Sequence, residues 1–560
     1  MKPLFRLGCG MLTTRVPGQA TGCRLGRDRL INLLMAAAAF ASLLQYLSTS
    51  IGNVGHTTFD DAYMVTRYAR HWLDGHGFCW NISDGPSYGI TSPAYLFLIT
   101  AVMWATGWPD DLVLTAASYG FGLLAVLALV WLGFRVFRAR GGHGSWLPLL
   151  TIPLMVSFPA FRFHSLTGME TTFSLFANVL MAASVFHAGQ RPTMQAMWRT
   201  LACACLAFSI RPDNGVYALL LPPLYWMAGE TPRIRYAFRY GLAFLLCAGA
   251  GLLVNRILFG DFVPLPFYAK TAGFYDGYLG VTKWNAVTGM ILFWTMALPS
   301  LVLVIATVSR RSIGLASSIL LPMAAAFAYY ATVTQIMGHQ ARYYYPSLAW
   351  VIFAAFVAVS IYLKDHPSGV AIPGLRMLAG LLVMISSLSF SFQRLATHLW
   401  ERYAMGIRPE AYTAEVLPGG DPTRRFPDLG WWQGIRSMNR LIAALPADIV
   451  LAASEYGYIG SRFPDLKILD FVGLHDRAVA RSADAVTYIL SRQPDVIWMP
   501  HSDYTHMVVR IRTHSDFQAN YEFHPDAYNF GVALNRSSRH YETMRAVLNR
   551  HLARLYPEAD

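Results

Sequence analysis

Long apolar stretches separated by short polar loops dominate the first 394 residues of the chain. A helix that crosses a bilayer needs about 20 consecutive, mostly apolar residues. Several of the stretches reach that length, and others are shorter. The pattern predicts a polytopic α-helical membrane protein with about 11–12 transmembrane helices. The apolar segments are 30–51, 91–107, 112–134, 146–161, 171–187, 198–211, 215–228, 240–258, 286–308, 313–335, 345–363 and 373–392.

The composition agrees with a membrane protein and argues against a nucleic-acid partner. Of 560 residues, 54% are hydrophobic and only 14% are charged, whereas soluble domains carry about 25% charged residues. The net charge of +13 raises the question of nucleic-acid binding. Many basic residues lie between apolar segments, where they set membrane orientation, and no basic stripe or stacking module accompanies them. We therefore expect no nucleic-acid partner.

Basic loops indicate which helix ends lie in the cytoplasm. Segments 191–199, 233–239 and 310–311 are rich in arginine, and such loops remain on the cytoplasmic side. The basic N-terminus, 1–29, is expected on that side too. Segment 30–51 is long enough to span and no cleavage-site pattern follows it, so we interpret it as an uncleaved first span. These features predict a multi-pass membrane protein with its N-terminus in the cytoplasm.

One inconsistency remains in this topology. The loop 52–90 should lie outside and the arginine-rich segment 135–140 inside, yet two apolar segments, 91–107 and 112–134, separate them. Two crossings would return the chain to the outside. Either one of these two segments is juxtamembrane or re-entrant, or the arginine-rich loops do not mark the cytoplasmic side here. We favour about eleven crossings, which reconcile a cytoplasmic N-terminus with an outside C-terminal domain.

Residues 395–560 have the pattern of a soluble domain outside the membrane. Short apolar runs at Ala447–Ala453, Lys467–Val472 and Asp495–Met499 predict buried strands, and Ser482–Arg492 predicts a helix. Alternating strands and helices are typical of an α/β domain. The expected regions are thus the cytoplasmic N-terminus 1–29, a transmembrane catalytic domain 30–394 with 52–90 as its first periplasmic loop, and the periplasmic domain 395–560.

The chain lacks the glycine-rich sequences of nucleotide-binding folds. It contains neither GxGxxG nor GxxxxGK followed by Ser or Thr, so neither a Rossmann nor a P-loop site is indicated. An enzyme that works outside the membrane has no nucleotide pool. Its activated substrate must arrive in another form, for example attached to a lipid.

Two adjacent carboxylates, Asp60 and Asp61, follow the first apolar segment by a few residues. An ionisable group close to hydrocarbon is costly and therefore marks a functional site by default. The position suits a general base at the mouth of a lipid-accessible cavity. The alternative is that both acids only stabilise the start of a helix expected over Ala62–Leu73.

The same loop carries a row of basic and aromatic residues. Tyr63, Arg67 and Arg70 recur at three- and four-residue spacing, so they share one helix face near the carboxylates. An acid, arginines and aromatic rings suit a site for an anionic ligand that bears a sugar. The alternative is an amphipathic surface helix whose arginines reach toward water.

Four further outside loops carry polar residues that membrane spanning does not require. Lys270, Arg342 and Arg211 are candidates to bind a phosphate through charge-assisted hydrogen bonds, although such residues also anchor helices at the interface. A metal site would need several converging ligands, which only Asp60, Asp61, Glu170 and Asp213 could supply. We therefore assign no metal ligands, and the sequence leaves metal dependence open. The loop residues of interest are Glu170, Arg211, Asp213, Lys270, His339, Arg342 and Tyr343.

These motifs resemble the GT-C glycosyltransferases, in particular mycobacterial terminal arabinofuranosyltransferases and related bacterial D-arabinofuranosyltransferases. The resemblance covers nearly the whole chain and is moderately specific for the family. An Asp-Asp pair distinguishes this branch from some aminoarabinose and mannosyl transferases that carry Asp-Glu. The matching residues are Asp60-Asp61, Thr167–Thr171, Arg211–Asp213, Tyr268–Lys270, Arg342–Pro346, Gly457–Ser461 and Ile468–Asp476.

The resemblance implies a polyprenyl-phosphate sugar as donor and a glycan or glycoprotein of the cell envelope as acceptor. The sugar would be D-arabinofuranose, transferred with inversion at the outer face of the membrane. Asp60 or Asp61 would act as general base, and Lys270, Arg342, Arg211 and Arg67 would bind the donor phosphate. Sugar and acceptor would contact Tyr63, Arg70, Glu170, Asp213, His339 and Tyr343.

Two alternatives remain open at this point. The first is a GT-C transferase of hexose or aminosugar that acts on protein or lipid A. The second is a transporter of a lipid-linked sugar, although the inverted repeats of many transporters are not evident in the sequence.

Overall fold

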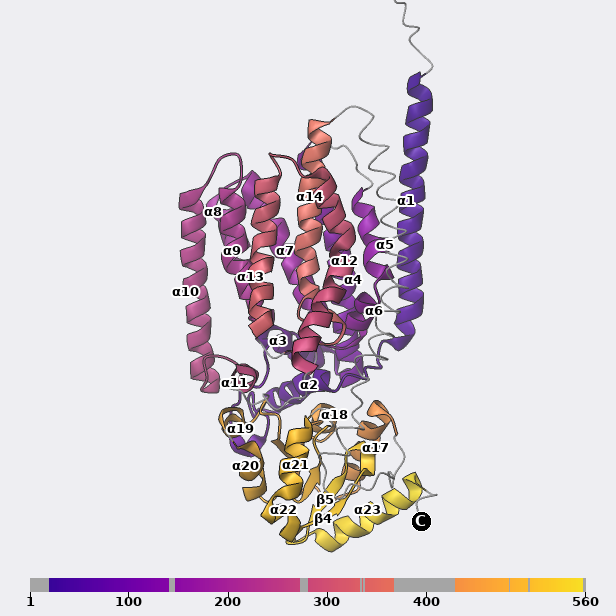
Figure 1. The fold of residues 1–560 in the computed structure, drawn as a ribbon, viewed down its shortest axis with the longest axis vertical. Helices are drawn as coiled ribbons and strands as arrows, with labels where there is room; N and C mark the ends of the chain where they lie inside the picture. The colour runs from indigo at the N-terminus through magenta and orange to yellow at the C-terminus, as the bar shows by residue number, and fades with distance from the viewer. Residues whose placement is uncertain are drawn as a thin grey trace, which may run out of the picture.

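The computed structural model describes residues 20–140, 147–271, 281–332, 335, 338–366, 429–482, 484–501 and 504–556. Figure 1 shows a tall helical bundle with a smaller domain of helices and strands packed against one end. Helix α2 (Asp60–Leu73) lies across that end, between the two parts. The predicted class, a polytopic helical protein with a C-terminal α/β domain, is confirmed. The predicted segment 373–392 and the start of the predicted C-terminal region lie outside the described residues.

Helices of very different length build the bundle. Six are long and apolar enough to cross a membrane, or seven when the bent pair α5 and α6 counts as one span, among the residues described. Several of the remaining predicted spans form shorter helices. The bundle helices are α1 (Ala20–Ser50), α3 (Pro93–Thr106), α4 (Asp110–Ala139), α5 (Thr151–Ser157), α6 (Pro159–Leu166), α7 (Thr171–Gln190), α8 (Met194–Ile210), α9 (Asn214–Met227), α10 (Ile234–Phe259), α11 (Leu265–Thr271), α12 (Val281–Thr307), α13 (Ile313–Thr332) and α14 (Leu348–Asp365).

Helix α3 bears on the inconsistency in the predicted topology. It has 14 residues, which span about 21 Å at 1.5 Å per residue, less than the hydrocarbon core of about 30 Å. Helix α3 begins at Pro93 and ends at Thr106, and three residues connect it to α4, which begins at Asp110. Asp110 pairs with Arg70 of α2, so both ends of α3 lie at the end of the bundle that carries α2. Segment 91–107 therefore forms a helix too short to cross a bilayer by itself, which favours the expectation that one of the two segments is juxtamembrane or re-entrant.

Packing and a few polar contacts hold the bundle together. Helix α14 is almost wholly enclosed by its neighbours, whereas α10 lies at the rim. Between apolar helices in lipid, close packing and interhelical hydrogen bonds drive association. Asn178 of α7 donates to Asn214 Oδ1 and to the carbonyl of Pro346, both at 3.2 Å. The hydroxyls of Tyr217 and Ser347 are 2.6 Å apart. These bonds fix the start of α14, and with it the preceding segment that carries Arg342.

The C-terminal domain contains a five-stranded sheet in the order β2-β1-β3-β5-β4. Strands β1, β2 and β3 are parallel, and β5 and β4 continue the sheet in antiparallel pairing. The three predicted strands and the predicted helix over 482–492 are present. The elements are α17 (Trp431–Ala443), β1 (Val450–Ala453), α18 (Gly457–Arg462), β2 (Lys467–Asp470), α19 (Arg477–Arg481), α20 (Ala485–Ser491), β3 (Val496–Trp498), α21 (Thr505–Thr513), α22 (Ser515–Asn520), β4 (Tyr521–His524), β5 (Val532–Asn535) and α23 (Tyr541–Leu555).

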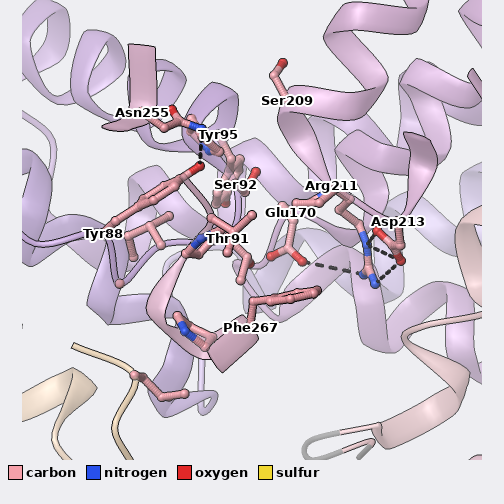
Figure 2. A pocket seen from close by; sticks show the side chains of 18 of the residues that line it. Tyr88, Thr91, Ser92, Tyr95, Glu170, Ser209, Arg211, Asp213, Asn255 and Phe267 are labelled. Carbon is pink, nitrogen blue, oxygen red and sulfur yellow. Dashed lines mark hydrogen bonds and ion pairs between the residues drawn. The ribbon is translucent and has the colours of Figure 1, made fainter. Parts of the chain in front are cut away.

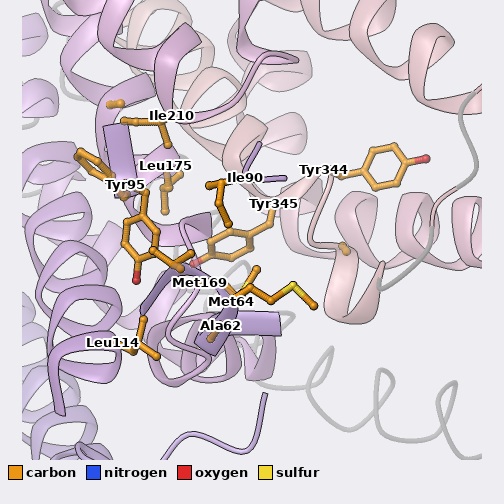
Figure 3. Packing of buried hydrophobic residues seen from close by; sticks show 14 of the residues in the cluster. Ala62, Met64, Ile90, Tyr95, Leu114, Met169, Leu175, Ile210, Tyr344 and Tyr345 are labelled. Atoms are coloured by element: carbon orange, nitrogen blue, oxygen red, sulfur yellow. The ribbon is translucent and has the colours of Figure 1, made fainter. Parts of the chain in front are cut away.

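A layer of buried apolar side chains lies directly under α2 (Figure 3). Ala62 and Met64 of α2 pack there together with Leu114 of α4 and Met169. Gly168, next to Met169, has φ +74°, and an added Cβ would lie 2.9 Å from the Leu114 Cβ. Glycine is therefore required at this turn. The close approach fixes the loop from which Glu170 leads into α7.

Candidate active site

A cavity of about 830 Å³ lies where the bundle meets the C-terminal domain. Figure 2 shows Glu170, Arg211 and Asp213 at one side of it and Tyr88 and Asn255 at another. Residues from the first loop, α8, α10, α11 and the C-terminal domain complete the wall. The cavity thus joins charged groups from loops that are distant in sequence, and most of these loops were predicted to lie on one side of the membrane.

The cavity has an apolar extension between α8 and α10. Leu206 and Phe208 of α8 and Gly251 and Leu252 of α10 line it. Val254 also lines it and is 50% exposed, so the cavity reaches the outer surface of the bundle. Helix α10 exposes many other apolar residues there, as a lipid-facing helix does. A long hydrocarbon chain could therefore lie in this extension with one end at the charged groups.

Asp61 faces this cavity from the first turn of α2. Asp61, Met64 and Val65 line the wall at helical spacing, so they form one face of the helix. The Asp61 carboxylate lies 3.8 Å from Arg342 Nη1. Burial raises the pKa of Asp61 above its usual value, although Arg342, Lys270 and His339 oppose the shift. A carboxylate with a raised pKa is a stronger base, which suits proton abstraction.

Asp60 points to the other side of α2 and lies outside the cavity wall. Its two carboxylate oxygens accept hydrogen bonds from the backbone N–H groups of Gly457 and Tyr458, each at 2.8 Å. A Cβ on Gly457 would lie 2.1 Å from the Asp60 carbonyl oxygen, so only glycine allows this approach. Burial raises the pKa of Asp60 to about 6, against the effect of these N–H donors. Asp60 therefore joins α2 to the start of α18.

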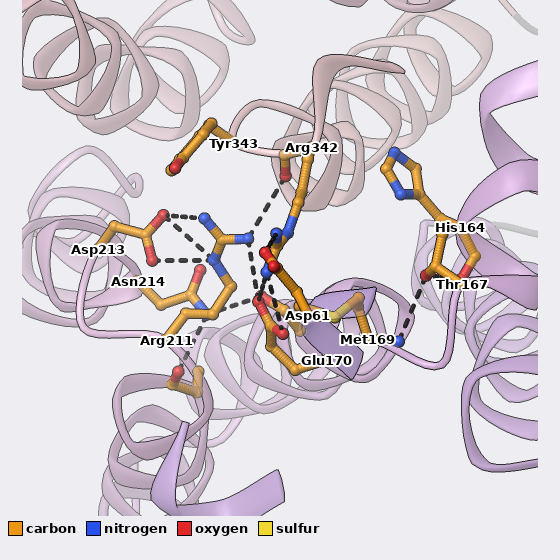
Figure 4. Close-up of polar contacts among 12 residues, drawn as sticks. Asp61, His164, Thr167, Met169, Glu170, Arg211, Asp213, Asn214, Arg342 and Tyr343 are labelled. Atoms are coloured by element: carbon orange, nitrogen blue, oxygen red, sulfur yellow. Dashed lines mark hydrogen bonds and ion pairs between the residues drawn. The ribbon is translucent and has the colours of Figure 1, made fainter. Parts of the chain in front are cut away.

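Four charged residues form a buried network beside Asp61 (Figure 4). Arg211 binds Asp213 through Nη2 at 2.8 Å and lies 3.6 Å from Glu170. Arg342 lies 3.3 Å from the same Glu170 carboxylate. Burial alone would raise the pKa of Glu170, but Arg342 and Arg211 lower it below its usual range. Glu170 is thus held ionised and orients both arginines toward the cavity.

Lys270 adds a third cation to the cavity wall, beside Arg211 and Arg342. Its Nζ lies 3.2 Å from the Tyr343 hydroxyl, and no carboxylate of the described residues is within ion-pair distance. Leu265, at the start of the same short helix α11, donates its N–H to the Tyr88 carbonyl at 2.7 Å. An ammonium group held in this way can attract a phosphate.

Several predicted site residues lie elsewhere. Arg67 is fully buried and donates to the carbonyls of Trp80 and Leu466, both at 2.7 Å. Tyr63 hydrogen-bonds Asp111, and Arg70 pairs with Asp110 at 2.6 Å. These three lie on the side of α2 that Asp60 shares, away from the cavity wall. His339 is exposed and is not part of the cavity wall; its ring lies edge-on against Phe59, and it lowers the pKa of Asp61.

The structure adds residues that the sequence did not indicate. Ser454, Glu455 and Tyr504 of the C-terminal domain line the same cavity as Asp61. Glu455 is 8% exposed and is the second residue after strand β1. An acid that follows a short strand is common in loops, so spacing alone carried no signal. Only the position of the whole domain brings it to the cavity.

Within the described part of the chain, no three His, Cys, Asp or Glu side chains are placed to hold a metal ion. Asp61, Glu170 and Asp213 are instead paired with arginines. The arrangement can bind an anion at Lys270 and Arg342 and accept a proton at Asp61.

Comparisons with known proteins add little to this description. A family model described as a domain of unknown function (DUF8728) matches residues 428–545, the region that holds the sheet. No curated protein sequence matches the chain.

Some solved structures have a similar fold. One is ArnT from Cupriavidus metallidurans in the apo state, with 14% identity and a TM-score of 0.45 over 89% of this chain and 98% of that chain. The same protein bound to undecaprenyl phosphate has 14% identity and a TM-score of 0.46 over 93% of this chain and 99% of that chain. An Archaeoglobus fulgidus oligosaccharyltransferase in complex with zinc and sulfate has 13% identity and a TM-score of 0.47 over 89% of this chain and 73% of that chain.

Proposed function

We propose that this protein is a GT-C glycosyltransferase that moves a sugar from a polyprenyl-phosphate donor to a hydroxyl group of an acceptor. One observation carries the proposal. A single cavity combines a carboxylate at 3.8 Å from an arginine, an ammonium group without a carboxylate partner among the described residues, and an apolar extension that opens at the rim of the bundle. Base, phosphate site and lipid groove are the three parts that such a reaction needs.

The donor would bind with its lipid in the groove between α8 and α10. Its phosphate would lie near Lys270 and Arg342, and its sugar between them and Asp61. Breaking the bond between the anomeric carbon and the phosphate oxygen releases polyprenyl phosphate, whose added negative charge the two cations stabilise. Because phosphate is a good leaving group, no general acid is needed. Arg211 is already bound by Asp213 and Glu170, so it supports Arg342 through Glu170.

The acceptor hydroxyl would attack from the opposite face of the sugar. Asp61 takes the proton of that hydroxyl as the new glycosidic bond forms, so configuration at the anomeric carbon is inverted. The transition state has oxocarbenium character, and the carboxylate near it also stabilises developing positive charge. Asp60 has both oxygens engaged by backbone N–H groups. We therefore assign the base to Asp61 and leave Asp60 a structural role.

The sequence motifs support a finer proposal. They favour D-arabinofuranose as the sugar and a cell-envelope glycan or glycoprotein as acceptor, at the outer face of the bacterial inner membrane. In that orientation the N-terminus lies in the cytoplasm and the C-terminal domain outside.

The test is transfer by the purified full-length protein from radiolabelled polyprenyl-phosphate arabinofuranose to a membrane-derived glycan. The same assay with polyprenyl-phosphate hexose or aminosugar separates the finer proposal from the coarser one. We expect arabinofuranosyl transfer that Asp61→Asn abolishes. If only a hexose or an aminosugar is transferred, the protein is a glycosyltransferase but arabinofuranose is not its sugar. Movement of the lipid-linked sugar across vesicles without any transfer would replace the enzyme by a transporter.

A further inference from the structure

The C-terminal sheet has a crevice at the ends of its central strands. Strand β1 lies between β2 and β3, and all three are parallel. After β1 the chain turns to β2 on one side, and after β3 it continues to β4 and β5 on the other side. In open α/β sheets, ligands bind where neighbouring connections diverge in this way, at the carboxyl ends of the strands. The crevice here lies between β1 and β3.

The residues at this crevice line the cavity that holds Asp61. Ser454 and Glu455 follow β1, and Tyr504 follows β3. The backbone N–H of His501 donates to Ser454 Oγ at 3.0 Å, and that hydroxyl lies 3.4 Å from Glu455 Oε1. The two diverging loops are therefore joined by a hydrogen bond. The loops after β1 and β3 therefore lie both at the crevice and in the cavity wall, to which Val472 and Leu474 after β2 also belong.

The side chains at the crevice are suited to a neutral ligand rich in hydroxyl groups. A carboxylate such as Glu455 accepts several hydrogen bonds and repels anions. A serine hydroxyl both donates and accepts, and a tyrosine ring offers an apolar face with a polar end. The cations that would bind the donor phosphate all come from the bundle and its loops. The bundle side of the cavity thus carries all the cations of the described lining together with three acids, whereas the one charged side chain that the domain contributes to that lining is Glu455.

We propose that the crevice between β1 and β3 is the acceptor subsite, where Glu455 and Ser454 bind hydroxyl groups of the terminal sugars of a neutral glycan. This inference rests on the proposed function and extends it. The donor reaches the cavity from the lipid side along α8 and α10, and the acceptor reaches it from the domain side. The acceptor hydroxyl that reacts lies between Glu455 and Asp61.

The test measures binding and turnover separately in the full-length protein. The probes are a synthetic arabinofuranosyl tetrasaccharide and maltotetraose, titrated into wild type, Glu455→Gln and Ser454→Ala. We expect Glu455→Gln to weaken oligosaccharide binding and raise acceptor KM by about tenfold, because a charge-assisted hydrogen bond is lost. Donor KM should not change. Glu542→Gln is the matched control, since Glu542 is exposed in the same domain on α23.

The outcomes separate the inference from the proposed function. Unchanged affinity for both probes in Glu455→Gln and Ser454→Ala would overturn the acceptor subsite, even with an active enzyme. If Glu455→Gln does not fold, as judged by its unfolding midpoint, Ser454→Ala and Tyr504→Phe carry the test. If wild type transfers no sugar from any donor, the proposed function fails. The direct titration would then still decide whether the crevice binds a glycan.

Discussion

The two faces of α2 carry similar residues but use them in opposite ways. On the face toward the C-terminal domain, Asp60 and Arg67 are buried and bonded to backbone groups. On the face toward the cavity, Asp61 is partly exposed and meets Arg342 at 3.8 Å. Backbone partners cannot move away to admit a ligand, whereas side chains around a cavity can exchange partners. The contrast separates charges that hold the fold from charges that are available for chemistry.

The largest effect is expected from the docking face, on stability. Arg67→Met would leave the carbonyls of Trp80 and Leu466 without their donor. A buried acceptor left without its donor costs about 1–3 kcal/mol, so the two carbonyls together cost about 2–6 kcal/mol. We expect the free energy of unfolding in detergent, followed by tryptophan fluorescence, to fall by that amount. The control is Arg462→Met, whose side chain is 37% exposed beside Asp111 and should cost less than about 1 kcal/mol. Equal losses in both variants would remove the distinction.

On the cavity face, Lys270→Ala should affect catalysis and leave stability unchanged. Removing one group that stabilises a developing negative charge typically lowers the rate by about 10²–10³-fold. We expect kcat/KM for the donor to fall to that extent, with an unchanged unfolding midpoint. Lys467→Ala is the control, because Lys467 pairs with Asp84 at 3.1 Å away from the cavity wall. A fully active Lys270→Ala protein would mean that the phosphate lies elsewhere.

A third variant tests whether the domain positions Lys270. Asp261 is buried and pairs with Arg477 at 2.8 Å and with Arg481. Arg481 also lies 4.7 Å from the Tyr268 ring on α11, the helix of Lys270. We expect Asp261→Asn to raise donor KM about fivefold while kcat changes less, and Asp261→Glu to restore most of the loss. A fall in kcat alone, or no rescue, would argue against positioning.

The smallest effect concerns pH. The pKa of Asp61 is raised, and the pKa of Asp60 is raised to about 6. Transfer should fall as pH decreases through the pKa of Asp61, because the protonated acid cannot accept a proton. Stability has the opposite sign: a raised folded-state pKa gives stabilisation below the unfolded value that is lost as pH rises through about 6. Activity and unfolding midpoint measured across this range should diverge. If activity and unfolding midpoint both rise with pH, the two carboxyl groups do not have raised pKa values.

The sequence predicted the membrane fold and most of the cavity but not the two faces of α2. Glu170, Arg211, Asp213, Lys270 and Arg342 belong to short motifs in separate loops, and all five line the cavity. Successive loops alternate between the two sides of a membrane, so every second loop lies at the same end of the bundle. Counting the spans was therefore enough to place these five residues on one side.

The residues on α2 show the limit of this reasoning. Spacing correctly placed Tyr63, Arg67 and Arg70 on one helix face, but it could not say which partner covers that face. Helix α4 of the bundle binds Tyr63 and Arg70 through Asp111 and Asp110. The C-terminal domain, nearly 400 residues away in the chain, binds Arg67 through the Leu466 carbonyl. For the same reason Glu455 was not predicted. Both depend on docking between distant parts of the chain, for which the hydrophobic pattern carries no signal.

The central claim is that Asp61 is the base and Asp60 a structural acid. The most direct test measures transfer rate and unfolding midpoint for Asp60→Asn and Asp61→Asn side by side. We predict that Asp61→Asn folds normally and loses about 10²–10⁴-fold in kcat. Asp60→Asn should lose about 1–3 kcal/mol of stability, because an amide cannot accept both N–H bonds, and retain most activity per folded molecule. An inactive but stable Asp60→Asn protein beside an active Asp61→Asn protein would contradict the account.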